Sequence, residues 1–378
     1  MMTEQPSHRA EPASADLVQL YRRSIEVIDA GQSPSGAYLA SPNFPVYRYS
    51  WFRDGAFIAD AMSRVGREDS AERFFAWCSG VLVARADLIE SHVASAAAGD
   101  RVDAAEMLHC RYTVDGEEAP EEWWNFQLDG YGTWLWALGA HATRHGRSLE
   151  PYAAAIDLCV RYLAAFWAEP SYDWWEENMG HQHTSTLAAL HAGLETASGW
   201  DVLEPATRAA AAHAAADIRE AILSRGVHDG RFAKWLDGDG LDGSLIACAV
   251  PFHVVAPDAP RARATARAIE LQLSRRGVYR HPNDSYYGGG EWLLLAALLG
   301  WYDATIGRRD EALSRLLWIA AQADADANLP EQVSDHLLVP DAYDGWRQRW
   351  GPIASPLLWS HAMFLTLAVE LGVVDGTP

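Results

Sequence analysis

The pattern of hydrophobic and polar residues is helical along nearly the whole chain. Apolar residues recur every three or four positions, as on one face of an α-helix, whereas the alternation expected of a β-strand is almost absent. The pattern therefore predicts an all-α protein. Helices are expected at residues 15–31, 54–66, 69–97, 129–145, 149–168, 182–197, 203–225, 242–251, 258–275, 290–304, 308–323 and 356–372.

Capping residues support the starts of several of these helices. Ser14, Thr184 and Ser355 stand at or next to a predicted start, where a hydroxyl can accept a hydrogen bond from an unpaired backbone N–H. Residues 226–240 differ, because their Asp-Gly pairs predict tight turns in a short β-hairpin. The chain is thus predicted to consist of helices and loops, with one hairpin between two helices.

The chain shows no sign of division into several domains. No segment rich in proline, serine or charge separates two halves, so we expect one domain over residues 15–375, preceded by a disordered segment at 1–14. Twelve helices fit six helical hairpins, and functional residues are expected on the long connections. Tryptophan, tyrosine and isolated acids gather on these connections, which are residues 32–53, 98–128, 169–181, 276–289 and 324–355.

Composition narrows the range of partners. The formal net charge of -21 argues against nucleic acid or an anionic membrane, because both require a basic surface on the protein. The 17 tryptophans outnumber the 10 phenylalanines. This excess indicates either a pocket lined by indole rings, on which sugars can stack, or a tryptophan-rich core.

Targeting signals and cysteines bear on the compartment. No apolar segment follows a basic start, and no run of about eighteen uncharged apolar residues occurs, so we expect a cytoplasmic protein outside the membrane. The four cysteines are too scattered for a zinc site or a disulfide framework. We expect buried free thiols at Cys78, Cys110, Cys159 and Cys248.

The clearest chemical candidate lies in residues 171–186, SYDWWEENMGHQHTST. A carboxyl group beside Trp174 and Trp175 is partly desolvated, which raises its pKa, so Glu176 is a candidate general acid. Alternatively, Glu176 and Glu177 lie in the first turn of a helix and interact with its dipole. These residues alone leave both interpretations open.

Two other segments carry polar side chains suited to a sugar. Glu331, in the loop LPEQVSDH, could activate water on the face opposite an acid, as in inverting glycoside hydrolysis with carboxyl groups roughly 6.5–9.5 Å apart. Arg53 and Asp54, in WFRDG, can bind neighbouring hydroxyls as donor and acceptor. The alternatives are a solvated loop glutamate and a structural ion pair at a helix start.

Metal and phosphate sites are not expected. His181 and His183 do not share one face of a helix or strand, and no cysteine or third histidine is near them in the sequence. Residues 237–243 resemble a calcium loop but lack its closing glutamate. The glycines at 288–290 lack the Lys-Ser/Thr ending of a phosphate loop. We therefore predict no metal and no cofactor.

Together these segments give the sequence a resemblance to the glucoamylase family, glycoside hydrolase family 15, from about Tyr47 to Glu370. The resemblance implies an (α/α)6 barrel in a single domain, and single-displacement hydrolysis at a non-reducing α-glucosyl end. Many relatives carry a β-sandwich or starch-binding module that this sequence lacks, so short soluble substrates are expected. The matching segments, in family order, are YRYSWFRDG, EEWWNFQLDGYG, SYDWWEEN, YRHPNDSYYGGGEW and NLPEQVSDH.

The resemblance also implies a role for individual residues. Glu176 matches the general acid, Glu331 matches the general base, and Tyr47 matches a tyrosine near the base and the attacking water. The positions that it implies for substrate binding are Trp51, Arg53, Asp54, Trp123, Gln127, Asp129, Trp175, Arg280, Tyr286, Trp292 and Trp359.

The resulting hypothesis is an inverting exo-α-glucosidase that releases β-glucose from short α-glucosides such as isomaltose. A trehalase or a maltose- or starch-type glucoamylase is an alternative within the same enzyme class. An inactive barrel that binds sugar or regulates another protein is the alternative from a different class. The expected partner is a small sugar, with no nucleic acid and no membrane, and the protein is expected to be a monomer or small homo-oligomer.

Overall fold

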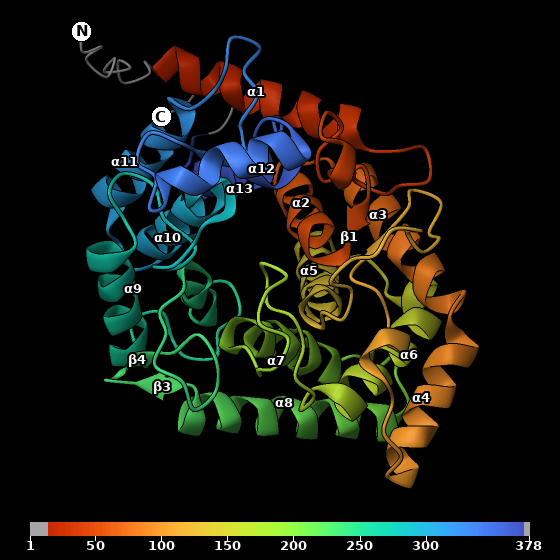
Figure 1. Ribbon diagram of the computed structural model, residues 1–378. Helices are drawn as coiled ribbons and strands as arrows, with labels where there is room; N and C mark the ends of the chain where they lie inside the picture. The colour runs from red at the N-terminus through yellow and green to blue at the C-terminus, as the bar shows by residue number, and fades with distance from the viewer. Residues whose placement is uncertain (1–13, 374–378) are drawn as a thin grey trace, which may run out of the picture.

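The computed structural model describes residues 14–373, and its helices form two concentric rings (Figure 1). The inner helices are buried on nearly every side, which agrees with their almost continuous runs of apolar and small residues. A 3-10 helix completes the ring by packing against α7 and α10. The inner ring is α2 (Phe52–Arg64), α5 (Asp129–His145), α7 (Thr184–Ser198), η4 (Gly243–Cys248), α10 (Leu293–Thr305) and α13 (Leu358–Glu370).

The outer ring consists of amphipathic helices, each buried on one face only. Each outer helix precedes an inner element in the chain, so the twelve elements form six hairpins. This arrangement is the (α/α)6 barrel that the resemblance implied, and the prediction of an all-α fold is confirmed. The outer ring is α1 (Ser14–Gly31), α3 (Glu68–Val83), α6 (Ala153–Phe166), α8 (Pro205–Arg225), α9 (Pro260–Gln272) and α11 (Arg309–Ala320).

Three predicted segments differ from the structure. The helix expected at 69–97 is wrong, because the chain turns at Arg85, whose guanidinium donates to the Gly116 carbonyl, and continues as α4 (Ala86–Ala98). The helix expected at 242–251 is only the 3-10 helix η4, and Pro251 has no N–H with which to extend it. The loop expected at 324–355 contains a further helix, α12 (Tyr343–Trp350).

Two of the predicted caps are also wrong. Helix α7 begins at Thr184 itself, after His183, and α13 begins at Leu358, after Leu357, so neither Thr184 nor Ser355 caps a helix. Ser14 is part of α1.

The predicted hairpin is confirmed. It consists of β3 (Val227–His228) and β4 (Arg231–Phe232), and its turn residues Asp229 and Gly230 have φ angles of 48° and 78°. These left-handed angles are typical of an Asp-Gly turn.

Two more short antiparallel pairs lie near the pocket described below. One joins β1 (Ser50–Trp51) to β2 (Arg111–Tyr112), and the other joins β5 (Glu291–Trp292) to β6 (Gln332–Val333). They connect loops that are far apart in the sequence.

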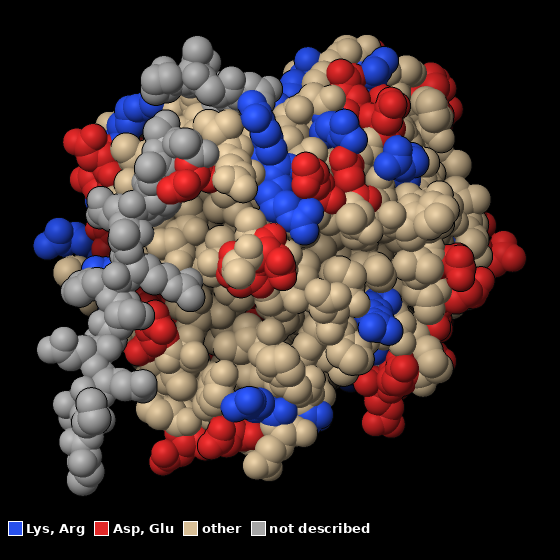
Figure 2. Space-filling model, turned by 90° about the horizontal axis from the view of Figure 1, so that it is seen from above, with Lys and Arg blue, Asp and Glu red and all other residues tan. Residues whose placement is uncertain are grey.

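The four cysteines of the chain are free and buried, as predicted. On the face drawn in Figure 2, basic and acidic side chains are interspersed. Among the helices in residues 14–373, none is long and apolar enough to cross a membrane. The expected segment at 1–14, apart from its last residue, and the expected end at 374–375 lie outside the described residues.

Candidate active site

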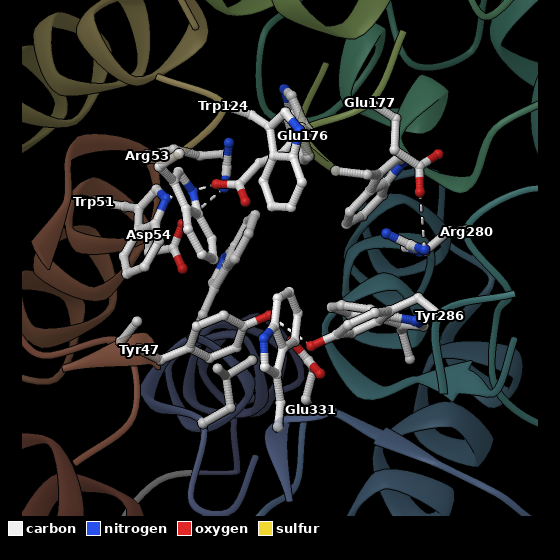
Figure 3. Close-up of a pocket in the computed structure, with 18 of the residues that line it drawn as sticks. Tyr47, Trp51, Arg53, Asp54, Trp124, Glu176, Glu177, Arg280, Tyr286 and Glu331 are labelled. Carbon is white, nitrogen blue, oxygen red and sulfur yellow. Dashed lines mark hydrogen bonds and ion pairs between the residues drawn. The ribbon is translucent and has the colours of Figure 1, made fainter. Parts of the chain in front are cut away.

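The residues predicted to bind or cleave a sugar gather around one pocket. Its walls are the first turns of inner helices α2 and α13 and the loops that precede the inner helices, so residues from distant hairpins face one another (Figure 3). Of the predicted residues, all except Gln127 and Asp129 line it. They are Tyr47, Trp51, Arg53, Asp54, Trp123, Trp175, Glu176, Arg280, Tyr286, Trp292, Glu331 and Trp359.

Glu176 lies in a tight turn that precedes α7. The carboxylate of Asp173 accepts the backbone N–H groups of Trp175 and Glu177, each at 2.9 Å, and its carbonyl accepts the N–H of Glu176 at 3.0 Å. The φ angle of Glu176 is 65°, a left-handed conformation that a non-glycine residue adopts at an energetic cost. Because α7 begins only at Thr184, the interpretation of Glu176 as a helix-start charge is wrong.

The indole of Trp51 orients the Glu176 carboxyl group. Its Nε1–H donates to Oε1 of Glu176 at 2.8 Å, so this bond leaves Oε2 for a second partner. Trp174 and Trp175 are both buried beside the turn. The carboxyl group therefore lies among indole rings on the wall of the pocket, and the charged side chains of Arg53 and Asp54 line the same pocket.

Glu331 enters the pocket from the opposite side (Figure 3). Helix α13 holds the loop of Glu331 through two hydrogen bonds. Nε2 of His361 accepts the N–H of Leu329 at 2.9 Å, and the Ser360 hydroxyl donates to the Pro330 carbonyl at 2.8 Å. Burial lowers the pKa of His361 to about 3, so its imidazole stays neutral and can serve as this acceptor.

The strand pair β5–β6 fixes the other end of the Glu331 loop. Gln332 pairs with Trp292, and its side-chain Oε1 accepts the N–H of Gly290 at 2.8 Å. A Cβ at position 290 would lie only 2.6 Å from that oxygen, so glycine permits this close approach. Glu331 is itself 2% exposed.

Two tyrosines stand next to Glu331. The hydroxyls of Tyr47 and Tyr286 are 2.8 Å apart, which joins the first and the fifth hairpins at this point. Burial raises the pKa of Glu331 to about 8, while the hydroxyls of Tyr47 and Tyr286 and the positive charge of Arg280 act in the opposite direction. The tyrosines thus favour the ionised form of a carboxyl group that burial disfavours.

Arg53 and Asp54 form a second polar cluster in the first turn of α2. Their side chains are 3.2 Å apart, and both line the pocket. Gln127 and Asp129 do not line it. They lie behind Arg53 and accept hydrogen bonds from its Nη1 at 2.8 and 3.1 Å. From this position, Gln127 and Asp129 support the guanidinium of Arg53.

Arg280 connects the Glu176 turn to the fifth hairpin. Its guanidinium binds Asp284 and lies 3.2 Å from Oε1 of Glu177, whose other oxygen is 3.0 Å from Nε2 of His281. Burial raises the pKa of Glu177, but the bond from His281 and the charge of Arg280 outweigh burial and hold the pKa at about 2. Glu177 is therefore an ionised pocket residue, which the sequence did not reveal.

Aromatic rings form much of the remaining wall, and the sequence identified only some of them. Trp350 lies nearly parallel to Trp123, with ring centroids 6.0 Å apart, and Tyr286 packs against Trp346. Trp346 and Trp350 lie on α12, the helix that was missed. Spacing by four residues in YDGWRQRW was the signal that could have placed both on one helical face. The lining tryptophans that the prediction omitted are Trp124, Trp174, Trp346 and Trp350.

The chemistry of this site is therefore that of two carboxyl groups facing each other among indoles, phenols and two arginines. Within residues 14–373, histidines, cysteines and acidic residues form no group of three that could hold a metal ion. Such a pocket can bind a polyhydroxylated ligand through stacking and charge-assisted hydrogen bonds, and it can donate and accept protons on opposite faces of that ligand.

Comparison with known proteins agrees with this geometry. The family described as "Glycosyl hydrolases family 15" matches residues 16–321, a range that includes Glu176 but ends before Glu331. The isomaltose glucohydrolase of Kribbella flavida is 48% identical over 363 residues, which cover 95% of this chain and 94% of that protein.

Solved structures give the same result. A glycosidase solved in complex with glucose has a TM-score of 0.94 at 46% identity, over 96% of this chain and 98% of that one. The glucoamylase from Saccharomycopsis fibuligera, at 16% identity, shares the fold with a TM-score of 0.71, over 97% of this chain and 98% of that one. From the matched range and these identities, we conclude that the chain belongs to glycosyl hydrolase family 15 and is a glycoside hydrolase.

Proposed function

We propose that the protein is an inverting exo-acting α-glucosidase that releases β-glucose from isomaltose and related short α-glucosides. The observation that carries the proposal is the placement of Glu176 and Glu331 on opposite sides of one pocket whose wall also holds Arg53, Asp54 and Arg280. The similarity to an isomaltose glucohydrolase over almost the full length of both chains supports this choice of substrate.

In the proposed reaction, the terminal glucose lies between the two carboxyl groups. Glu176 donates its proton to the glycosidic oxygen, which leaves with the second sugar, while Glu331 accepts a proton from the water that attacks the anomeric carbon from the other face. Arg53 and Asp54 bind hydroxyls of the glucose. The water and the leaving sugar lie on opposite faces, so the anomeric configuration inverts.

The alternatives are separated by a substrate panel. Isomaltose, maltose, trehalose, kojibiose and soluble starch are offered to the purified protein, and NMR records the anomer of the first glucose released. We expect isomaltose to be hydrolysed fastest, with β-glucose formed first. Release of α-glucose would rule out inversion, and a preference for trehalose or maltose would reassign the linkage. Binding of sugar by calorimetry without hydrolysis would favour the inactive barrel.

Glu331 also sets an expectation for the pH profile. A general base acts when ionised, so kcat/KM is expected to rise as pH passes through the pKa of this group. Because burial raises that pKa and the Tyr47 hydroxyl lowers it, Tyr47→Phe is expected to move the acidic limb of kcat/KM to higher pH. The check is a pH–rate profile, with Tyr38→Phe as the matched loss of a buried hydroxyl away from the pocket. An unmoved limb would contradict this role for Tyr47.

We also propose that the protein acts in the cytoplasm as a monomer or small homo-oligomer. Four free, buried cysteines support a reducing compartment.

A further inference from the structure

Lys234 is the only lysine among the 30 lysine and arginine residues of the chain. Elsewhere the sequence uses arginine, so general composition does not explain the lysine. It is 6% exposed and follows strand β4, where its backbone N–H donates to Gly240 and its carbonyl accepts the N–H of Thr184. Its ammonium group therefore lies in a position that the backbone fixes.

The ammonium group lies between two buried carboxylates. Nζ of Lys234 is 3.2 Å from Oδ2 of Asp173 and 3.1 Å from Oδ2 of Asp242, and the aspartates are 2% and 1% exposed. Lys234 is not among the residues that line the pocket. A compact, tetrahedral ammonium can donate to two carboxylates in this space, whereas the larger planar guanidinium of arginine has a different reach and donor geometry.

Each of these carboxylates holds part of the turn that carries Glu176. Asp173 accepts the N–H groups on both sides of Glu176, and Asp242 accepts the indole N–H of Trp175 at 2.9 Å. The turn includes the left-handed backbone of Glu176, so these bonds keep a costly conformation in place.

The charges of this cluster depend on one another. Burial lowers the pKa of Lys234, but Asp242 and Asp173 outweigh burial, and the net pKa is raised. Burial raises the pKa of Asp242, but Lys234 is the largest influence in the opposite direction, and the net pKa is lowered. Loss of the ammonium would leave two carboxylates buried near each other without this positive charge, and they would then protonate or move apart.

We propose that Lys234 is a positioning residue for proton donation by Glu176, acting through Asp173 and Asp242 without contact with the sugar. This inference rests on the proposed function, because it assigns Glu176 the role of general acid. Displacement of the turn would move the Glu176 carboxyl group away from the glycosidic oxygen, and a misplacement of about 1 Å can cost about 100-fold in rate.

The test compares two substrates that differ in their need for an acid. Departure of the second sugar from isomaltose requires a proton, whereas fluoride leaves α-glucosyl fluoride without one; both need water activated by the base. In Lys234→Met we expect kcat for isomaltose to fall by about 10- to 100-fold, with kcat for the fluoride changed by less than about threefold and KM for isomaltose nearly unchanged. Arg225→Met is the matched control, because it removes a cation from an exposed ion pair with Asp237 in the same region.

Several outcomes would overturn the proposal. Equal losses on both substrates would indicate a general structural role, and unchanged rates on isomaltose would remove any role in catalysis. If Lys234→Met does not fold, the same comparison is made with Lys234→Met combined with Asp242→Asn, which restores the net charge of the cluster. Equal losses in that double variant would reject the proposal in the same way.

Failure of the proposed function itself is a separate result. It would appear in the unaltered protein as no hydrolysis of isomaltose or as release of α-glucose. The two-substrate comparison then uses the member of the panel that the unaltered protein hydrolyses fastest. The Lys234 proposal is therefore judged by the rate of the variant relative to that of the unaltered enzyme on each of the two substrates.

Discussion

Replacement of Glu331 by glutamine is expected to lower kcat by about 10²- to 10⁴-fold, on both isomaltose and α-glucosyl fluoride. Glutamine has the size of glutamate but cannot accept the proton of the attacking water, and both substrates need that water. The loop should remain in place, because it is held through Leu329, Pro330 and Gln332. Single-turnover and steady-state rates on both substrates check the expectation, and activity near that of the unaltered enzyme would exclude Glu331 as the base.

The same replacement is expected to make the folded protein more stable at neutral pH. The pKa of Glu331 is raised by burial to about 8, above that of an exposed glutamate, so ionisation favours the unfolded chain as pH rises between these two values. This destabilisation is absent below about pH 4 and grows by about 1.4 kcal/mol per pH unit toward pH 8. In Glu331→Gln, Tm should therefore exceed that of the unaltered protein at pH 7 and converge with it near pH 4. A difference in Tm independent of pH would contradict this account.

Replacement of Glu176 by glutamine is expected to give a different pattern. The rate on isomaltose should fall by about 10²- to 10⁴-fold, because the leaving sugar no longer receives a proton. The rate on α-glucosyl fluoride should fall much less, since fluoride leaves without that proton and Glu331 still activates the water. The bond from Trp51 can be kept, because the amide oxygen of glutamine accepts the same indole N–H. Comparable losses on both substrates would show that Glu176 is not the acid.

The two variants control each other. Both replace a carboxyl group of the same pocket by an amide of the same size, so a general change in the pocket would affect the two substrates in a similar way. Only separate roles as acid and base give a loss on one substrate in Glu176→Gln and on both in Glu331→Gln. Thermal unfolding of each variant establishes that the barrel persists.

The barrel could be predicted from the sequence because buried inner helices and amphipathic outer helices leave a clear period of three to four residues. The period does not determine where a long helix turns. At the break, Arg85 bonds Gly116, 31 residues away, and no local signal encodes that contact. The inner element at 243–248 has the apolar composition of a helix, but the proline that follows limits its length.

The site was predictable where unusual residues stand together. Glu176 beside two tryptophans and Arg53 beside Asp54 can be seen in short segments. The positions of Gln127 and Asp129 could not be predicted, because the sequence does not distinguish a polar residue that lines a pocket from one that lies behind its wall. Lys234 was also missed, since a single lysine just after a hairpin suggests a solvated charge, and its partners lie on other segments.

The hydrogen bond that joins the last helix, α13, to the first, α1, has a consequence for synthesis of the protein. His361 of α13 bonds Ser24 of α1, and the same helix holds the loop of Glu331. A ribosome-bound chain that ends before α13 would contain the proposed acid and most of the sugar-binding residues, but it would lack this support for the base. Catalytic competence is therefore expected only after the final helix emerges from the ribosome, so that unfinished chains hydrolyse no sugar.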